Sequence, residues 1–328
     1  MVSYFLAFLA GLVNATGNVL NRKAAREEPD QAEFKLKLIT DLMHRKVWLA
    51  AVGMMIISFA LAAAALGTGQ LASVQLVVVL ELPMTIIGGA LLLRSPLDGR
   101  EWIAIAALTA GVIGLLALLD PQPGTAKHIA PILWITMSAA NIALIVALFL
   151  AARRHSKPAV RASLLGVASG LAYGLTAAYT KGMADAFNHG GIVAVFTTWQ
   201  FYACAVAGVG AAFLLENAYQ AGPLAASQPG VTLIDPMVST VWGIVVFGET
   251  VRHGAVLGLT VLPAAAVAVG VFLLSRSNIL RTTQTGLDDA RQDQAAKDRP
   301  AVPAPAPVPT ADAQSRPAER QSQPTDSR

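Results

Sequence analysis

The chain has 328 residues, of which 55% are hydrophobic and only 13% are charged, and its mean hydropathy is +0.56. A soluble domain carries roughly 25% charged residues, so this composition excludes an ordinary water-soluble globular protein. The single cysteine, Cys204, excludes an intramolecular disulfide and a Cys-rich metal site. The small net charge of +4 gives no reason to expect a nucleic-acid partner.

Apolar stretches near 20 residues recur along the chain, and about 20 apolar residues span a bilayer core of about 30 Å. No basic residue precedes the first stretch and Arg22 and Lys23 follow it, which fits a retained helix with its N-terminus outside. We predict nine transmembrane helices, at residues 2–21, 47–66, 70–93, 101–119, 129–151, 162–182, 192–216, 223–247 and 254–275. The predicted fold class is therefore an all-α polytopic membrane protein.

Basic residues in the connecting segments support this topology. With the N-terminus outside and nine crossings, the outer side receives only Lys127, Lys181 and Arg252, and all other Lys and Arg residues are cytoplasmic. Lys and Arg accumulate in cytoplasmic loops. We expect a multi-pass protein of the cell membrane, surrounded by the lipid bilayer, with its C-terminus in the cytoplasm.

Two segments differ from this pattern. The first loop, residues 24–46, interleaves apolar and charged residues, so it is either an amphipathic helix on the membrane surface or a solvated loop. From about Thr282 the composition changes to Gln, Asp, Ala and Pro, which cannot bury enough apolar area to fold. We predict a transmembrane domain over residues 1–276 and a disordered cytoplasmic tail over 277–328.

An internal repeat relates the two halves of the chain. Residues 65–84 align with residues 218–237 without a gap at a constant offset of 153. The alignment pairs the two glutamines and the two prolines of the predicted third and eighth helices, namely Gln75 with Gln228 and Pro83 with Pro236.

The repeat predicts an inverted architecture. Repeat one covers about residues 1–119, the helix at 129–151 links the halves, and repeat two covers about 162–275. Matching helices lie five crossings apart, so they run in opposite directions and give a 4+1+4 arrangement. Inverted repeats are characteristic of transporters that alternate access around a site at the membrane midplane.

The second half also resembles a known family. The pattern consists of Ala218-x-x-x-Gly222-Pro-Leu-Ala-Ala-Ser-Gln228-Pro, then Asp235-Pro236 and Gly248-Glu249. It resembles drug/metabolite transporter (DMT, EamA-like) superfamily proteins and is most similar to their branch with NIPA-type magnesium transporters. The run Gly17-Asn18-Val19-Leu20-Asn21-Arg22-Lys23 agrees with that branch.

The resemblance covers about residues 1–276 and implies a multi-helix secondary transporter or a pathway for Mg²⁺. The sequence departs from the superfamily pattern in two respects. Many members have ten helices rather than nine, and the first-half motif here ends in Leu93-Arg94-Ser95 rather than Gly-Glu.

Two acidic residues lie inside predicted helices, Glu81 in the third and Asp235 in the eighth. A carboxylate at the membrane midplane costs about 2.5–3.5 kcal/mol on insertion scales, so it usually faces the bundle interior and has a function. The repeat places the two acids one residue apart, about 100° around their helices. They are candidate ligands for a cation, including a metal ion, or for a proton. The alternative is two protonated carboxyls hydrogen-bonded to neighbouring helices.

Prolines follow both acids closely. Pro83 and Pro236 each remove the helical hydrogen bond to the carbonyl four residues earlier, which belongs to Val79 and Thr232 respectively. We expect helix kinks that leave free carbonyl oxygens beside the carboxylates, the ligand type that hard cations take. The alternative is an ordinary kink without a ligand.

Several other polar and small residues lie in or near the predicted helices. Amides that either line a polar pathway or join helices are Gln75, Gln228, Asn14 and Asn18. The spacing of Gly166, Gly170 and Gly174 predicts a helix-packing face. Near helix ends, Lys181 and Asp185 either steer ions or, as we expect, form a solvated pair, and Glu249 is expected to contact water or a loop.

The leading functional hypothesis is a secondary transporter or uniporter of a small solute, with Mg²⁺ as the first choice because of the resemblance. One alternative is a proton-coupled exporter of small metabolites or cationic drugs. Another is a membrane adaptor that binds partners through its Pro-rich tail. No nucleophile–base arrangement or cofactor motif occurs in the sequence, so we expect neither an enzyme nor a cofactor. A homodimer is compatible with all three hypotheses.

Overall fold

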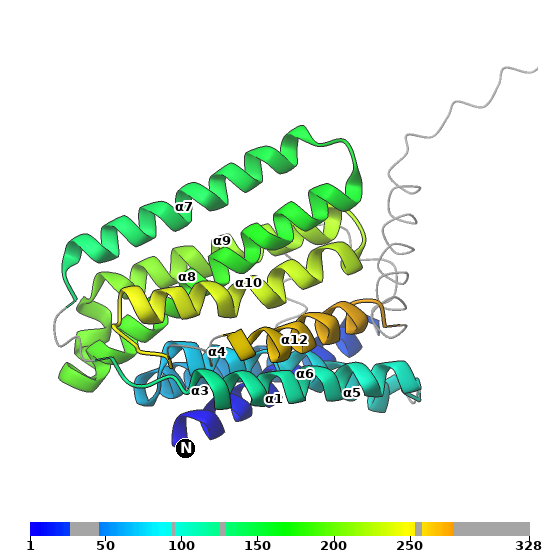
Figure 1. The fold of residues 1–328 in the computed structure, drawn as a ribbon, viewed down its shortest axis with the longest axis horizontal. Helices are drawn as coiled ribbons and strands as arrows, with labels where there is room; N and C mark the ends of the chain where they lie inside the picture. The colour runs from blue at the N-terminus through cyan, green and yellow to red at the C-terminus, as the bar shows by residue number, and fades with distance from the viewer. Residues whose placement is uncertain (27–45, 94–95, 125–128, 253–257, 278–328) are drawn as a thin grey trace, which may run out of the picture. The chain divides into compact units, whose positions relative to one another are not determined.

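The computed structural model describes residues 1–26, 46–93, 96–124, 129–252 and 258–277. Over these ranges every regular element is an α-helix, and the long helices run roughly side by side (Figure 1). They are α1 (Val2–Arg26), α3 (Lys46–Thr68), α4 (Leu71–Val78), α5 (Glu81–Leu93), α6 (Gly99–Leu119), α7 (Pro131–Arg154), α8 (Pro158–Thr197), α9 (Trp199–Ala221), α10 (Leu224–Val245) and α12 (Val261–Leu274). The expected all-helical fold class is confirmed for the described ranges. Most of the first loop, residues 27–45, and the predicted disordered tail lie outside them.

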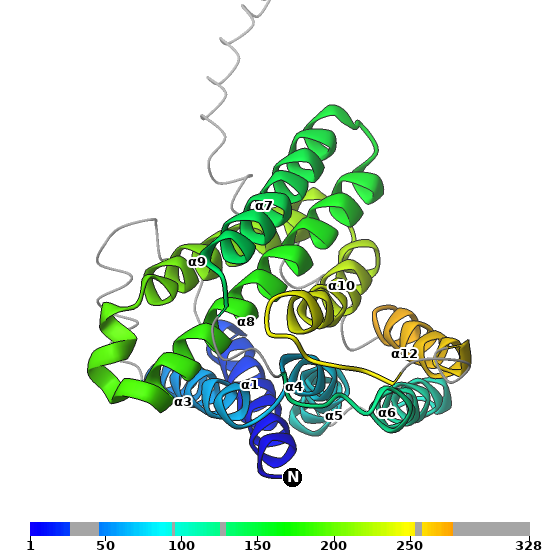
Figure 2. The ribbon, with the colours of Figure 1, turned by 60° about the vertical axis from the view of Figure 1, so that its left-hand side comes forward.

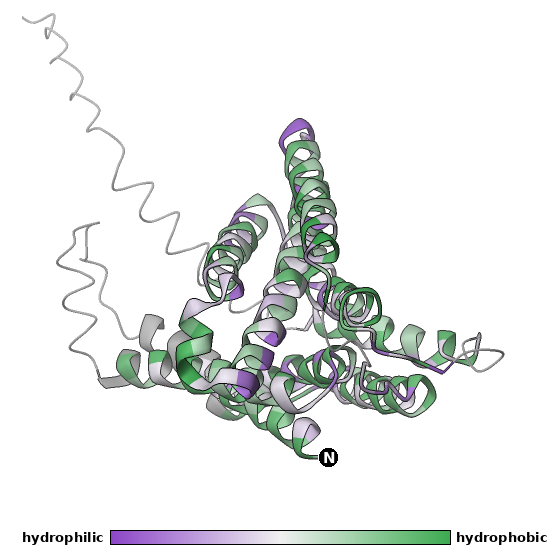
Figure 3. Ribbon diagram, turned by 90° about the vertical axis from the view of Figure 1, so that its left-hand side faces the viewer, coloured by the Kyte–Doolittle hydropathy of each residue, from purple (hydrophilic) through white to green (hydrophobic). Residues whose placement is uncertain are grey.

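Five helical stretches in the described part of the chain are long and apolar enough to cross a membrane: Leu71–Leu91, Gly99–Leu119, Pro131–Arg154, Pro158–Thr197 and Trp199–Ala221. Shorter apolar helices are Val2–Gly17, Val52–Thr68 and Val261–Leu274. Apolar residues cover most of the length of the helices (Figure 3), and many of their large side chains are exposed. Exposed apolar surface of this extent indicates a membrane-embedded protein. The number of nine crossings stays a prediction.

The helix expected over residues 70–93 is divided into α4 and α5. At the break, the N–H of Leu82 donates to the carbonyl of Val79 at 3.2 Å, three rather than four residues back. Pro83 explains this geometry, because it has no N–H and its ring clashes with the carbonyl four residues earlier. The Val79 carbonyl therefore has a hydrogen-bond donor, contrary to expectation. Glu81 becomes the first residue of α5.

The two prolines of the repeat act differently, because α10 continues through Pro229 and Pro236 without a break. The boundaries expected near residues 182 and 192 also need correction. Helix α8 continues to Gly191, whose φ of 66° and ψ of −158° interrupt it, and such a backbone conformation is essentially confined to glycine. The prediction ended this helix early because polar residues at 185–189 lower the hydropathy without ending the helix.

The helices of the two halves pack in corresponding pairs (Figures 1 and 2). Helix α1 packs against α3, α4 and α5, and α8 packs against α9 and α10. Across the halves, α4 contacts α10 and α6 contacts α12, while α7 lies against α8. These are the pairings that a repeat of α1–α6 in α8–α12 requires, although the inverted repeat itself stays a prediction.

The predicted glycine face of α8 is confirmed as a packing surface. A Cβ atom at Gly166 would lie 2.4 Å from the carbonyl oxygen of Ser227, and one at Gly170 would lie 2.8 Å from that of Gly230. The backbones of α8 and α10 are therefore in direct contact. This close packing fixes α10, which carries Asp235, against α8.

Candidate functional site

Asp235 lies in α10 and accepts hydrogen bonds from two side chains. Gln75 of α4 donates from Nε2 to Asp235 Oδ1 at 3.3 Å. Ser239, one turn further along α10, donates from Oγ to the same oxygen at 3.2 Å. Gln75 Nε2 also lies 3.4 Å from Ser239 Oγ. These three side chains join the first half of the chain to the second.

Glu81 is held from a different helix. Asn14 of α1 donates from Nδ2 to Glu81 Oε1 at 2.7 Å. The backbone of α1 approaches closely here, since a Cβ atom at Gly11 would lie 3.7 Å from the Cβ of Glu81. The start of α5 is thus fixed against α1 by both packing and a hydrogen bond.

The two carboxylates lie in neighbouring parts of the fold. Helix α4 contacts α10, its Gln75 donates to Asp235, and Glu81 is the first residue of the next helix, α5. Like charges repel more strongly in a medium of low polarity than in water. A cation or a proton that binds near both carboxylates would relieve this repulsion.

Asp235 has no fixed counter-charge in the described part of the chain. The ion pairs found there are Lys181–Asp185 and Arg252–Asp120, and neither involves Asp235. Its hydrogen-bond donors, Gln75 and Ser239, are neutral. Because charges inside proteins are normally paired, an Asp235 carboxylate held only by neutral donors is suited to a mobile cation or proton.

The other predicted site residues are not brought to the carboxylates in the same way. Gln228 accepts a hydrogen bond from the Tyr219 hydroxyl at 3.2 Å, and its Nε2 lies 3.5 Å from Thr232 Oγ1. Its repeat partner, Gln75, instead contacts Asp235. The side chain of Asn18 lies outside the described part.

One partner of Asp235, Ser239, was missed from the sequence. It follows Asp235 by four residues, which places both on the same helix face, so the spacing could have identified it.

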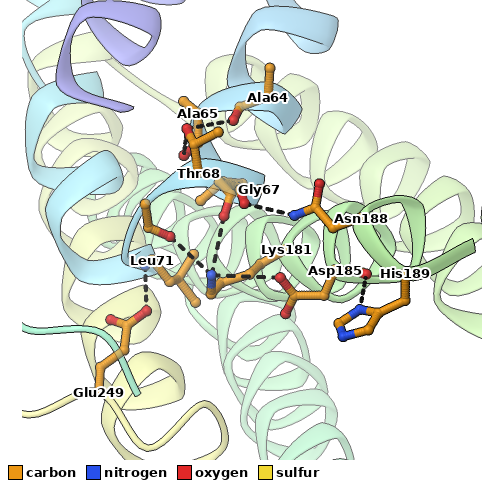
Figure 4. A network of polar contacts seen from close by, with 12 residues as sticks. Ala64, Ala65, Gly67, Thr68, Leu71, Lys181, Asp185, Asn188, His189 and Glu249 are labelled. Carbon is orange, nitrogen blue, oxygen red and sulfur yellow. Dashed lines mark hydrogen bonds and ion pairs between the residues drawn. The ribbon is translucent and has the colours of Figure 1, made fainter. Parts of the chain in front are cut away.

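A second polar network joins the turn between α3 and α4 to the second half of the chain (Figure 4). Lys181 Nζ donates to the carbonyls of Leu66 and Gly69 at 3.1 and 3.0 Å. Asn188 Nδ2 donates to the carbonyl of Gly67 at 2.8 Å. These carbonyls lie at the C-terminus of α3, where a cation is favoured by the helix dipole.

This arrangement corrects the expected solvated pair of Lys181 and Asp185. Their charged atoms are 4.0 Å apart, at the limit for an ion pair, and the Lys181 side chain is only 12% exposed. The ammonium group of Lys181 is therefore hydrogen-bonded mainly to backbone carbonyls. The sequence could not show this, because the acceptors lie more than a hundred residues away.

Glu249 binds the same turn at the start of α4. Its carboxylate accepts the N–H groups of Leu71 at 2.5 Å and Ala72 at 3.1 Å. These residues begin α4, where backbone N–H groups have no partner within the helix. Glu249 is 3% exposed, so of the two expected surroundings, water and a loop, the structure shows the turn between α3 and α4. Burial raises the pKa of Glu249 above its ordinary value, although the two N–H donors and Lys181 act in the opposite direction.

Replacing Glu249 by alanine is expected to destabilise the protein, because the N–H groups of Leu71 and Ala72 lose their acceptor. An unsatisfied buried donor costs about 1–3 kcal/mol. Thermal unfolding in detergent would measure the effect. The matched control is Asp120→Asn, which removes the charge of an exposed pair with Arg252 and should cost at most about 1 kcal/mol. Equal shifts in Tm for both variants would contradict the capping role of Glu249.

Comparisons with known proteins supply no function. No family model matches the chain, and no solved structure matches it. An uncharacterized protein of Corynebacterium glutamicum is 26% identical to it over 249 residues, which cover 76% of this chain and 86% of the relative. The chain is thus similar to a bacterial protein over most of the length of both, and the functional argument depends on the site itself.

Proposed function

We propose that the protein is a secondary transporter or uniporter that moves a small cationic solute across the cell membrane. Glu81 and Asp235 are its proposed substrate- or ion-binding residues. The supporting observation is the Asp235 carboxylate, which is held by neutral donors from both halves of the chain. The nine-helix topology and the inverted 4+1+4 repeat are part of this proposal.

A divalent cation, Mg²⁺ first, is the proposed substrate. Mg²⁺ loses water reluctantly and needs only one or two carboxylates with several retained waters. Within the described ranges, no three or more His, Cys, Asp or Glu side chains are grouped to hold a metal ion. A pair of carboxylates, Glu81 and Asp235, suits a partly hydrated ion in transit better than a permanently bound one.

Proton-coupled export of a small metabolite or cationic drug is the second candidate. The neutral donors at Asp235 favour it, because an intramembrane carboxylate without a fixed counter-charge can exchange a proton for a cationic substrate. The adaptor hypothesis depends on the Pro-rich tail, which lies outside the described residues.

Reconstitution into liposomes tests the proposal. We expect entry of Mg²⁺, followed with an internal fluorescent indicator, to require the native protein and to fall to the level of empty liposomes in Glu81→Gln. The amide keeps the shape of the side chain but not its negative charge. The matched control, Asp120→Asn, changes an exposed carboxylate and should leave the rate unchanged.

The same liposomes separate the alternatives. Mg²⁺ entry without proton movement supports a uniporter. Proton movement that requires an added organic cation supports the exporter. If neither Mg²⁺, Mn²⁺ nor organic cations cross in a protein-dependent manner, transport is refuted and the adaptor hypothesis is favoured.

A further inference from the structure

The polar network around the α3–α4 turn lies at one end of the bundle. Leu71, which donates its N–H to Glu249, precedes Glu81 by about ten residues, and about 1.5 Å per helical residue gives a separation of about 15 Å. That is half of the bilayer core of about 30 Å. The carboxylates therefore lie near the middle of the bundle, and the network closes one of its ends.

Aromatic rings fill the bundle on the same side of Asp235. Trp134 of α7 lies at the centre of four other rings, with centroid distances of 5.3 to 5.9 Å to Tyr179, Trp199, Trp242 and Phe247. Trp242 follows Asp235 by two helical turns and is 1% exposed. Lys181 Nζ lies 5.3 Å from the centroid of the Phe247 ring, so the rings continue from Asp235 to the polar network.

The inner face of α10 is closed between Asp235 and the polar network. Pro236, Ser239, Trp242 and Gly243 are buried there, while Met237 and Val241 lie on the exposed face of the same stretch. A solute that enters from the side of Lys181 and Glu249 therefore meets closed packing.

Two side chains from the second half of the chain, one positively and one negatively charged, bind the α3–α4 turn. Lys181 of α8 binds the carbonyl end of α3, and Glu249, after α10, binds the amide end of α4 (Figure 4). Both contacts end when the turn moves away from α8 and from the segment that follows α10. We propose that Lys181 and Glu249 form a gate, which is closed in this structure and must open for a solute to reach Glu81 and Asp235 from this end.

Spin labels test the movement of the gate without any substrate. In a Cys204→Ser background, labels are attached to cysteines at the exposed positions Thr68 and Phe187, on the two sides of the gate. Pulsed electron paramagnetic resonance measures the distance between the two labels. It should give a single short distance for the otherwise native protein and an additional longer distance after Lys181→Met or Glu249→Gln. The control Arg252→Gln, which removes an exposed pair, should leave the distances unchanged. Unchanged distances in both gate variants would overturn the proposal.

A reversible disulfide tests whether opening is required for transport. A Cβ atom at Gly67 would lie 3.3 Å from the Cβ of Ala184, close to the separation of about 3.5–4.5 Å in disulfides. The variant Gly67→Cys/Ala184→Cys, in the Cys204→Ser background, should lose Mg²⁺ entry on oxidation and recover it on reduction. Recovery shows that the protein is folded. Unchanged entry in the fully oxidised variant would refute the gate.

This inference rests on the proposed function, and the two can fail separately. If Mg²⁺ does not cross, the transport proposal fails for this ion while the spin-label distances still decide the gate. If Asp235→Asn transports normally but the oxidised disulfide blocks entry, the site assignment is wrong and the gate is correct.

Discussion

Asp235→Asn is expected to reduce transport in liposomes to the background rate while the protein stays folded and inserted. Neutralising a carboxylate at the membrane midplane removes an insertion cost of about 2.5–3.5 kcal/mol. A purely structural Asp235 therefore predicts an unchanged or more stable protein with normal transport. Asn keeps the shape and can still accept hydrogen bonds from Gln75 and Ser239, but it has no charge to attract a cation or release a proton.

Two measurements on the same preparation separate these outcomes. The initial rate of cation entry reports function, and thermal unfolding in detergent reports folding. Asp120→Asn is a suitable control, because its side chain is 45% exposed and lies after α6, away from the α10 site. Normal transport by Asp235→Asn and Glu81→Gln together would show that the site assignment is wrong and would make Gln75 and Gln228 the next candidates.

Gly166→Ala is expected to destabilise the packing of α8 against α10. The added Cβ would lie 2.4 Å from the carbonyl oxygen of Ser227, which belongs to the backbone and cannot rotate away. Overpacking in a well-packed interior costs about 1–3 kcal/mol and occasionally more. We expect a lower Tm in detergent and a smaller yield of folded protein.

The control for this change is Gly210→Ala on α9. A Cβ atom at Gly210 meets no atom within 4 Å, and alanine favours a helix over glycine by about 1 kcal/mol. This variant should be as stable as the native protein or more stable. The same loss of stability in both variants would show that the α8–α10 contact is not the cause.

The sequence predicted the helices well because each needs only a run of apolar residues. It failed where the backbone departs from a simple helix. The break between α4 and α5 lies four residues before Pro83, at the Val79 carbonyl, and the sequence alone does not show whether a proline bends or divides a helix. The same residue type at Pro236 leaves α10 continuous, since the surrounding helices decide the outcome.

The sequence identified both acids of the candidate site but not all of their partners. Gln75 was expected near the carboxylates and contacts Asp235, whereas Gln228 contacts Tyr219. The role of Lys181 was misjudged because a charge near a helix end is usually solvated, and the helix end that Glu249 binds could not be identified from the sequence. Here each charge is bound to backbone groups of a distant helix end, and such pairing depends on tertiary structure.

Because α4 is separated from α5, it is a short helix that can tilt as a unit about the break between them. Helix α4 has eight residues, with the Glu249 contacts at its first turn and the break just after its last. Gln75, in its middle, donates to Asp235. A tilt of α4 about the break would release Glu249 and withdraw the Gln75 amide from Asp235 in one movement. The state of the gate and the hydrogen bonding of the carboxylate would then change together, so that occupancy of the site and access to it are mechanically coupled.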